Sequence, residues 1–312
     1  MGRSARAPAF LTDKEDRYGH SPCKDHPYQE QDTSWFGSDY NMNLYRAALW
    51  CIYCDSRSTC SHVEDFDRVC VKENALVLLR AVLRRKVRTG VIGSGAMCDS
   101  YNPFERTELV TRHALELMDA FGFGASMLTK SPLILRDTDL YQEISTHSPV
   151  LCMMTITTAD DGLSKKIEPG VPASSERFAA VRAMADQGLY TGVVMTPLLP
   201  FLEDTEQNIR EMAKRTADTG ARFLYGIMGV TIRDGQREYF YDALTKRFPG
   251  ERLAERYAAA YGNRYSCASP RARKLWETFT EECRREGLLW DMKDIIHDYK
   301  KKYACTQLEF QF

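Results

Sequence analysis

Two cysteines, Cys51 and Cys54, give the strongest chemical signal in the chain. Thiolates at this spacing can share one metal centre, and the pair is compatible with half of a zinc site, a redox pair or part of an iron–sulfur site. A zinc site closed by the protein needs four ligands, and the sequence has no second Cys-x-x-Cys to complete one. Polar and charged residues follow Cys54 where a thioredoxin-like pair would continue as a helix. These observations shift the weight toward an iron–sulfur site, with a structural zinc site or no metal as the alternatives.

Further candidate ligand-binding residues lie at the ends of apolar runs. Ser94 and Gly95 close one such run, and small residues there let the backbone approach a ligand closely, although a simple turn has the same pattern. Lys130 ends the next run, and Thr155 and Thr157 end the one after. At the mouth of a barrel a cation and hydroxyls would hold the carboxylate and ribose of a ligand. A solvated surface lysine is the plainer alternative.

The elements that carry these residues alternate along the chain. Six apolar runs, several nearly continuous as in strands buried on both faces, alternate with segments of helical periodicity. The expected strands are 43–50, 89–95, 125–131, 149–158, 190–200 and 222–231. The expected helices are 74–86, 105–121, 137–145, 174–187 and 205–219, with Gly122, Gly188 and Gly220 as C-caps. This order predicts an α/β fold, a partial (β/α)6 barrel of the TIM type.

The expected division of the chain has three parts. Residues 1–40 are polar without a sustained apolar period and predict an extended N-terminal arm. Residues 41–235 form the expected barrel, and 236–312 predict a C-terminal helical extension packed on it. Basic and aromatic side chains alternate in the extension, which could grip phosphates and stack bases, but nearby acids nearly balance the charge. We favour a helical cap whose charges face water.

The bulk composition limits the function classes. The 312 residues carry a formal net charge of −1, so no overall electrostatic attraction to nucleic acid or to a membrane surface is expected. No apolar run reaches the roughly 18 residues of a membrane span, and the first residues do not resemble a signal peptide. Ten dispersed cysteines differ from the arrays of small secreted proteins. A soluble, cytoplasmic protein is expected.

Several segments in order resemble one known family. The cysteine segment, which spans 43–46 and 51–58, is similar to the cluster segment of radical S-adenosylmethionine proteins of the spore-photoproduct-lyase-like type. The resemblance continues from about residue 41 to the C-terminus through 99–105, 128–131, 155–158, 174–178 and 233–240. It implies a radical S-adenosylmethionine partial barrel and DNA repair chemistry of the lyase type.

The resemblance also implies cofactors, partners and site residues. Such proteins hold a 4Fe-4S cluster by Cys-x3-Cys-x2-Cys, chelate S-adenosylmethionine on the open iron, and cleave it reductively to a 5'-deoxyadenosyl radical. The implied partners are S-adenosylmethionine, an electron donor such as a flavodoxin or ferredoxin, and a nucleic acid substrate. Cys51 and Cys54 would be the metal ligands and Cys98 the hydrogen-atom donor, although a buried structural cysteine is the plainer interpretation of Cys98. The implied cofactor-binding residues are Tyr53, Ser94, Gly95, Asp99, Lys130, Thr155, Thr157 and Arg177.

The sequence departs from the family motif at its first cysteine. Ala47 stands four residues before Cys51, and an alignment from Asn43 places Ala48 there instead. Cys23 or Cys60 would have to supply the third thiolate. The leading hypothesis is a radical S-adenosylmethionine enzyme with Cys51 and Cys54 as cluster ligands. Its cluster is either completed by a substitute ligand or missing or weakly held. The alternatives are a degenerate, non-catalytic barrel that acts as a binding or scaffold module, and a nucleic-acid-binding module that acts through its C-terminal helices.

Overall fold

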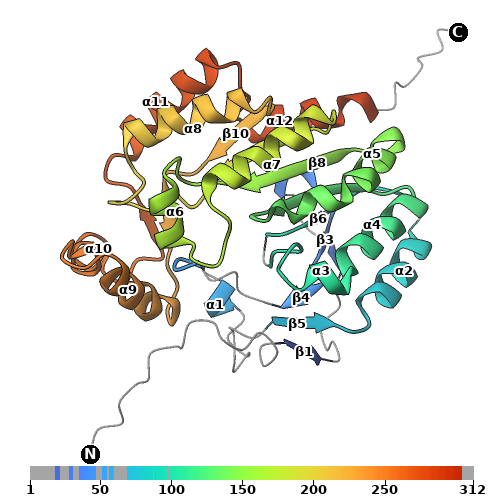
Figure 1. The fold of residues 1–312 in the computed structure, drawn as a ribbon, viewed down its shortest axis with the longest axis horizontal. Helices are drawn as coiled ribbons and strands as arrows, with labels where there is room; N and C mark the ends of the chain where they lie inside the picture. Colours follow the sequence, from blue (N-terminus) through green and yellow to red (C-terminus); the bar gives the residue numbers. More distant parts are fainter. Residues whose placement is uncertain are drawn as a thin grey trace, which may run out of the picture.

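A twisted sheet of seven strands forms the centre of the computed structural model (Figure 1). The structure describes residues 18–21, 28–30, 35–46, 51–54, 56–59, 69–86, 88–96 and 98–303. The strand order is β10-β9-β8-β7-β6-β3-β2, in which the first six are parallel and β2 is antiparallel to β3. The strands are β2 (Tyr28–Glu30), β3 (Tyr40–Met42), β6 (Val91–Ser94), β7 (Gly124–Thr129), β8 (Val150–Thr155), β9 (Thr191–Met195) and β10 (Phe223–Gly226). Six parallel strands with intervening helices confirm the predicted partial barrel.

Helices follow the strands in the expected alternation and lie side by side along the sheet (Figure 1). They are α2 (Ala75–Arg85), α3 (Glu105–Glu108), α4 (Val110–Ala120), η3 (Pro132–Asp137), α5 (Thr138–His147), α6 (Asp161–Ile167), α7 (Ser174–Asp186) and α8 (Glu206–Asp218). Gly122, Gly188 and Gly220 all have positive φ after helices, as predicted for C-caps.

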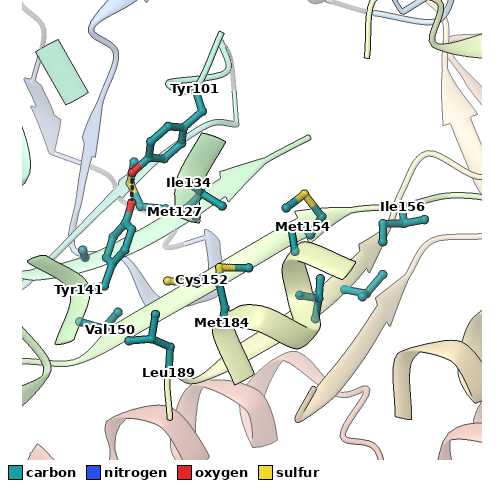
Figure 2. Close-up of a cluster of buried hydrophobic side chains, with 14 of the residues drawn as sticks. Tyr101, Met127, Ile134, Tyr141, Val150, Cys152, Met154, Ile156, Met184 and Leu189 are labelled. Atoms are coloured by element: carbon teal, nitrogen blue, oxygen red, sulfur yellow. Dashed lines mark hydrogen bonds between the residues drawn. The ribbon is translucent and has the colours of Figure 1, made fainter. Parts of the chain in front are cut away.

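The two faces of the sheet bury different side chains. In β8, Cys152 and Met154 enter the large core on the helix side, part of which Figure 2 shows, where Tyr101 also meets Tyr141. The alternate residues Leu151 and Met153 enter a smaller core on the other face. That core is closed by η2 (Trp35–Gly37) and α12 (Met292–Lys300). Burial on both faces explains why these strands are continuously apolar.

The predicted first strand, residues 43–50, is wrong. The first parallel strand of the barrel is the earlier β3, and Tyr45–Arg46 form β4 in a separate sheet with β1 (Tyr18–Ser21) and β5 (Val69–Lys72). Leu44 and Tyr45 are buried beside Val69 and Val71 of β5. The segment is apolar because it packs in this second sheet, and not because it is a strand of the barrel. Residues 47–50 lie outside the described part of the chain.

The predicted helix 105–121 is interrupted at Leu109, which has a φ of 56°. The side chain of Glu105 accepts hydrogen bonds from the backbone nitrogens of Thr111 and Arg112 at 3.0 and 3.4 Å. A carboxylate at this place satisfies N–H groups that have no partner inside a helix, so α4 begins afresh at Val110.

The chain after the barrel contains helices and one further strand. β11 (Gly229–Thr231) pairs with β12 (Ser266–Ala268) in an antiparallel ribbon, so the predicted extension is not purely helical. The helices there are α9 (Gln236–Arg247), α10 (Leu253–Tyr261), α11 (Ala272–Arg285), α12 and η4 (Lys301–Tyr303). Near the start of the chain, the short helix α1 (Ser56–Thr59) follows the cysteine pair. None of the described helices is long and apolar enough to cross a membrane. The domain boundaries stay a prediction, and most of the expected arm lies outside the described residues.

Candidate functional site

A cavity of about 400 Å³ lies where the carboxyl ends of the parallel strands meet, the position of the active site in barrel enzymes. Its walls come from the cysteine turn, the loop after β6, the ends of β7 to β9 and the ribbon of β11 and β12. Eight of the eleven predicted site residues line it: Cys51, Tyr53, Cys54, Gly95, Cys98, Asp99, Lys130 and Thr155. The other three, Ser94, Thr157 and Arg177, are buried outside its lining.

The turn Cys51–Cys54 forms one wall of this cavity. Cys51 and Tyr53 are buried and Cys54 is half-buried, and the turn is closed by a hydrogen bond from Cys54 N to the Cys51 carbonyl at 3.4 Å. Burial raises the pKa of the Cys51 thiol to about 12, although the positive charge of Lys130 opposes this shift. A thiol in this position is protonated at neutral pH, and a bound metal ion would supply the positive charge that favours the thiolate.

Behind the turn lies an ion pair that the sequence did not reveal. The hydroxyl of Tyr53 donates to Oε1 of Glu168, and Arg177 Nη2 lies 2.6 Å from Oε2 of the same carboxylate. Arg177 and Glu168 are both fully buried. Arg177 also donates to the carbonyl of Thr155 at 2.8 Å and to Ser164 Oγ at 2.7 Å. Arg177 therefore fixes Glu168 rather than facing the cavity.

Lys130 places a cation at the cavity wall. Burial lowers the pKa of its ammonium, but the negative charges of Cys51, Glu168 and Asp99 outweigh burial and raise the pKa overall. Its Nζ lies 6.0 Å from the centre of the Tyr53 ring. The site can thus bind an anionic group such as a carboxylate.

Asp99 is occupied by hydrogen bonds within the protein. Its Oδ1 accepts from Tyr101 N at 2.8 Å and from Thr129 Oγ1 at 2.7 Å, and its Oδ2 accepts from Lys130 N at 2.8 Å. The carboxylate therefore ties the loop after β6 to the end of β7 and sets the backbone position of Lys130. Its part at the site is to hold the wall in place.

The end of β6 is tightly packed against its neighbours. Ser94 Oγ donates to the Met42 carbonyl at 2.8 Å and lies 2.6 Å from Ser100 Oγ. Gly95 has a φ of 99°, and a Cβ at this position would lie 1.7 Å from the Leu128 carbonyl oxygen. Only glycine allows this approach of the two backbones, so the small residues at 94 and 95 serve the packing of strands β3, β6 and β7.

A second buried carboxylate lies near the Glu168 pair. Oε2 of Glu203 accepts from Leu199 N at 2.8 Å, whereas Glu203 Oε1 and Thr157 Oγ1 have no hydrogen-bond partner of good geometry. Burial raises the pKa of Glu203 to about 8, against the opposing effects of the Thr157 hydroxyl and the Leu199 amide. Glu203 is therefore largely a neutral acid at pH 7.

The described residues supply two thiols of the expected cluster motif. No group of three or more His, Cys, Asp or Glu side chains that could hold a metal ion occurs within the described ranges. Cys23, Cys60, Ala47 and Ala48 all lie outside them. The described site therefore matches two of the three thiolate positions of the family motif.

Sequence reasoning missed two residues that contact the cysteine turn, Glu168 and Gln236. It also missed Glu203, whose charge contributes to the raised pKa of Tyr53. The Nε2 of Gln236 donates to the carbonyl of Tyr53 at 2.9 Å. Glu168 follows a short helix and Gln236 begins a longer one, and neither position carries a spacing pattern. Only tertiary structure brings them to the turn.

The chain is similar in sequence to proteins whose function is uncharacterized. No protein family model matches the chain. An uncharacterized protein of Mycobacterium tuberculosis is 29% identical over 269 residues, which cover 83% of this chain and 77% of that protein. An uncharacterized protein of Methanocaldococcus jannaschii is 31% identical over 179 residues, 56% of this chain and 66% of its own.

Solved structures give the fold directly. Spore photoproduct lyase complexed with dinucleoside spore photoproduct has a TM-score of 0.65 at 15% identity, covering 87% of this chain and 80% of that one. A variant of the lyase with bound AdoMet and the dinucleoside has a TM-score of 0.63 at 15% identity, with coverages of 92% and 88%. The chain therefore has the partial barrel fold of spore photoproduct lyase, as predicted.

Proposed function

We propose that the protein is a radical S-adenosylmethionine enzyme that binds this cofactor in the cavity at the ends of the barrel strands. The observation that carries the proposal is the meeting of two thiols, Cys51 and Cys54, with the cation of Lys130 on the walls of one cavity. The fold adds support, since a solved variant of spore photoproduct lyase with the same fold contains AdoMet. Fold likeness alone does not assign an activity, so the site residues carry the argument.

Cys51 and Cys54 would hold a 4Fe-4S cluster as two of its thiolate ligands. Cluster iron prefers thiolates, and the third would come from Cys23 or Cys60, which lie outside the described residues. When bound and reduced, the cluster supplies the electron that breaks a carbon–sulfur bond of S-adenosylmethionine. Burial of Cys51 restricts the access of water to that side of the turn.

The protein's own residues would bind and orient the cofactor. Lys130 provides a positive charge for the methionyl carboxylate, and Thr155 provides a hydroxyl on the same wall. The ring of Tyr53 offers an apolar surface for the adenine, while Gly95 forms part of the cavity wall beside the end of β7. Cys98, half-buried on the cavity wall, would donate a hydrogen atom to a product radical.

The substrate class and the electron donor are part of the proposal. The solved lyase complexes with the same fold hold a dinucleoside photoproduct, which makes a nucleic acid lesion the first substrate to test. A base inside a duplex would have to leave the stack to reach a cavity at the end of the barrel. A flavodoxin or ferredoxin would serve as the electron donor.

Cofactor cleavage by the protein tests this function. The anaerobically reconstituted protein, reduced with dithionite, is incubated with S-adenosylmethionine, and 5'-deoxyadenosine and methionine are measured. We expect both products from the wild type and none above background from Cys51→Ala or Cys54→Ala. A wild type that releases neither product would contradict the proposal.

A non-catalytic barrel is the second candidate, because the described residues hold only two thiols of a three-thiol motif. In that case S-adenosylmethionine would bind without iron and without cleavage. Equilibrium dialysis with the iron-free protein separates the two functions. Binding that is unchanged by cluster loading, together with no cleavage products, would favour the binding module.

A further inference from the structure

We propose that Glu168 and Gln236 are positioning residues that fix the turn Cys51–Cys54 from two distant segments of the chain. The inference rests on the proposed function, in which this turn holds the cluster. Neither residue lines the cavity, so each acts through the turn and not on the cofactor.

Gln236 holds the backbone of the turn from the start of α9. Its side chain is fully buried, and Nε2 donates to the carbonyl of Tyr53 at 2.9 Å. Its Oε1 accepts from Arg233 N at 3.1 Å, so both ends of the amide are used. The contact crosses 183 positions of sequence. A buried amide with both ends bonded has one orientation, which it imposes on the carbonyl that it meets.

Glu168 holds the other side of the turn from the end of α6. Its carboxylate accepts from the Tyr53 hydroxyl and lies 4.0 Å from the Cys51 sulfur. The backbone beside it adds a hydrogen bond from Ile52 N to the Ile167 carbonyl at 3.0 Å. Arg177 neutralises the carboxylate, which makes its complete burial tolerable.

Packing places the turn with these two segments and not with the main core. Cys51, Ile52 and Tyr53 belong to a cluster that includes Ile167, the last residue of α6, and Phe240 of α9. The large core on the helix side of the sheet is separate. The helices α6 and α9 thus complete the cysteine site, and the chain after residue 235 is part of it.

Thiol accessibility in the iron-free protein tests the proposal without using the cluster. Wild type and variants are treated with N-ethylmaleimide at fixed pH, and each cysteine is followed by mass spectrometry. In Gln236→Ala, a change between neutral residues, we expect Cys51 to react at least about tenfold faster, as loss of one buried hydrogen bond implies. The buried Cys152 and Cys283 report global opening and should not change.

Glu168→Gln is the second variant and should also expose Cys51 selectively. Glu282→Gln is the matched control, because Glu282 is a buried carboxylate paired with Arg285 on α11, away from the turn. It should leave the Cys51 rate at the wild-type value. Equal acceleration of Cys51 and Cys152, or no acceleration of Cys51 in either variant, would overturn the positioning role.

Iron content distinguishes this inference from the proposed function. Wild type that binds no iron after reconstitution would defeat the proposed function, while the maleimide rates would still decide whether the turn is fixed. If iron is bound, we expect Gln236→Ala to lose it to a chelator at least about tenfold faster than Glu282→Gln does. Equal loss from the two variants would count against the positioning role.

Discussion

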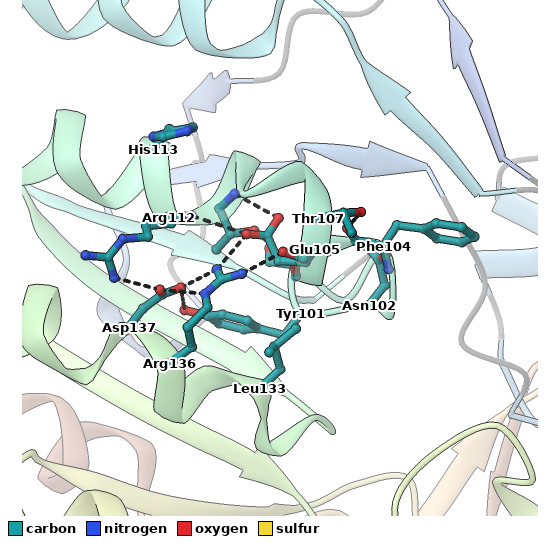
Figure 3. A network of polar contacts seen from close by, with 12 residues as sticks. Tyr101, Asn102, Phe104, Glu105, Thr107, Arg112, His113, Leu133, Arg136 and Asp137 are labelled. Atoms are coloured by element: carbon teal, nitrogen blue, oxygen red, sulfur yellow. Dashed lines mark hydrogen bonds and ion pairs between the residues drawn. The ribbon is translucent and has the colours of Figure 1, made fainter.

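Two buried networks of arginine and carboxylate in this molecule differ in how completely they are satisfied. The first joins Glu105, Arg136 and Asp137 near the start of α4 (Figure 3). Both oxygens of Glu105 accept hydrogen bonds, from Tyr45 and Arg136 among others. Both oxygens of Asp137 are likewise bonded, with Tyr101 as one donor. Every carboxylate oxygen in this network has a partner.

The second network comprises the ion pair of Glu168 and Arg177 and the neighbouring carboxyl group of Glu203, whose pKa responds to the charges of both. Here Arg177 Nε, Glu203 Oε1 and Thr157 Oγ1 are buried without a hydrogen-bond partner. Burial raises the pKa of Glu203 to about 8. Structural networks are normally complete, and incomplete ones concentrate at functional sites. We therefore expect the first network to contribute mainly to stability and the second to belong to the site.

The largest effect is expected from Arg136→Ala. The change would leave Glu105 and Asp137 buried with one cationic partner fewer, and breaking such a pair costs about 3–5 kcal/mol. Urea denaturation at pH 7 measures the loss in the free energy of unfolding. A loss below about 1 kcal/mol would show that this network does not carry stability and would remove the contrast.

Glu203→Gln should change how stability depends on pH. The folded-state pKa of Glu203, about 8, lies above its ordinary value of 4.5, so its contribution is fully present below pH 4.5 and is lost as pH rises through 8. Between pH 6 and pH 9 the wild type should lose about 2–3 kcal/mol more than the variant. Denaturation curves across this range measure the free energy of unfolding of both proteins. If it changes with pH equally in the wild type and in Glu203→Gln, Glu203 is not a protonated acid at pH 7.

A matched pair of threonines sharpens the comparison. Thr111 Oγ1 donates to the Ser100 carbonyl at 2.8 Å beside the first network. Thr157 Oγ1 makes no hydrogen bond of good geometry, although its hydroxyl lowers the pKa of the neighbouring Glu203. Thr111→Val should destabilise the protein by about 1–2 kcal/mol, and Thr157→Val should be neutral or slightly stabilising. Thermal unfolding of both variants compares them. Equal losses would mean that Thr157 is bonded after all.

The smallest effect is expected at the surface. Arg273 and Glu277 form an exposed i,i+4 pair at 3.2 Å on α11. Glu277→Ala should change the free energy of unfolding by less than about 0.5 kcal/mol, because water screens such pairs. Urea denaturation sets this baseline for the buried variants. A loss above 1 kcal/mol would show that charge pairs matter here regardless of burial.

The sequence predicts the barrel well because each of its strands after β3 is a continuous apolar run that both faces bury. Eight of the eleven candidate residues line one cavity, since parallel strands bring their carboxyl ends to one edge; their roles stay a prediction. The first strand was misplaced because the apolar residues Leu44 and Tyr45 pack in a second sheet. The break at Leu109 depends on a side chain, Glu105, that caps the next helix.

The supports of the cysteine turn could not be predicted from local pattern. Glu168 and Gln236 meet Tyr53 across 115 and 183 positions of sequence. No periodicity or spacing in the sequence predicts contacts over such distances. Glu168 lies at the end of a helix and Gln236 at the start of one, and polar residues are common at both positions. β12 was missed for a related reason, since three residues pair with β11 after two intervening helices.

Iron and sulfide content after anaerobic reconstitution tests the central claim most directly. The wild type should bind about four irons per chain with a matching amount of sulfide and a brown absorption spectrum. Cys51→Ala and Cys54→Ala should each lose the cluster, and loss in either Cys23→Ala or Cys60→Ala would identify the third ligand. A wild type without iron, or iron retained in both Cys51→Ala and Cys54→Ala, would contradict the cluster site.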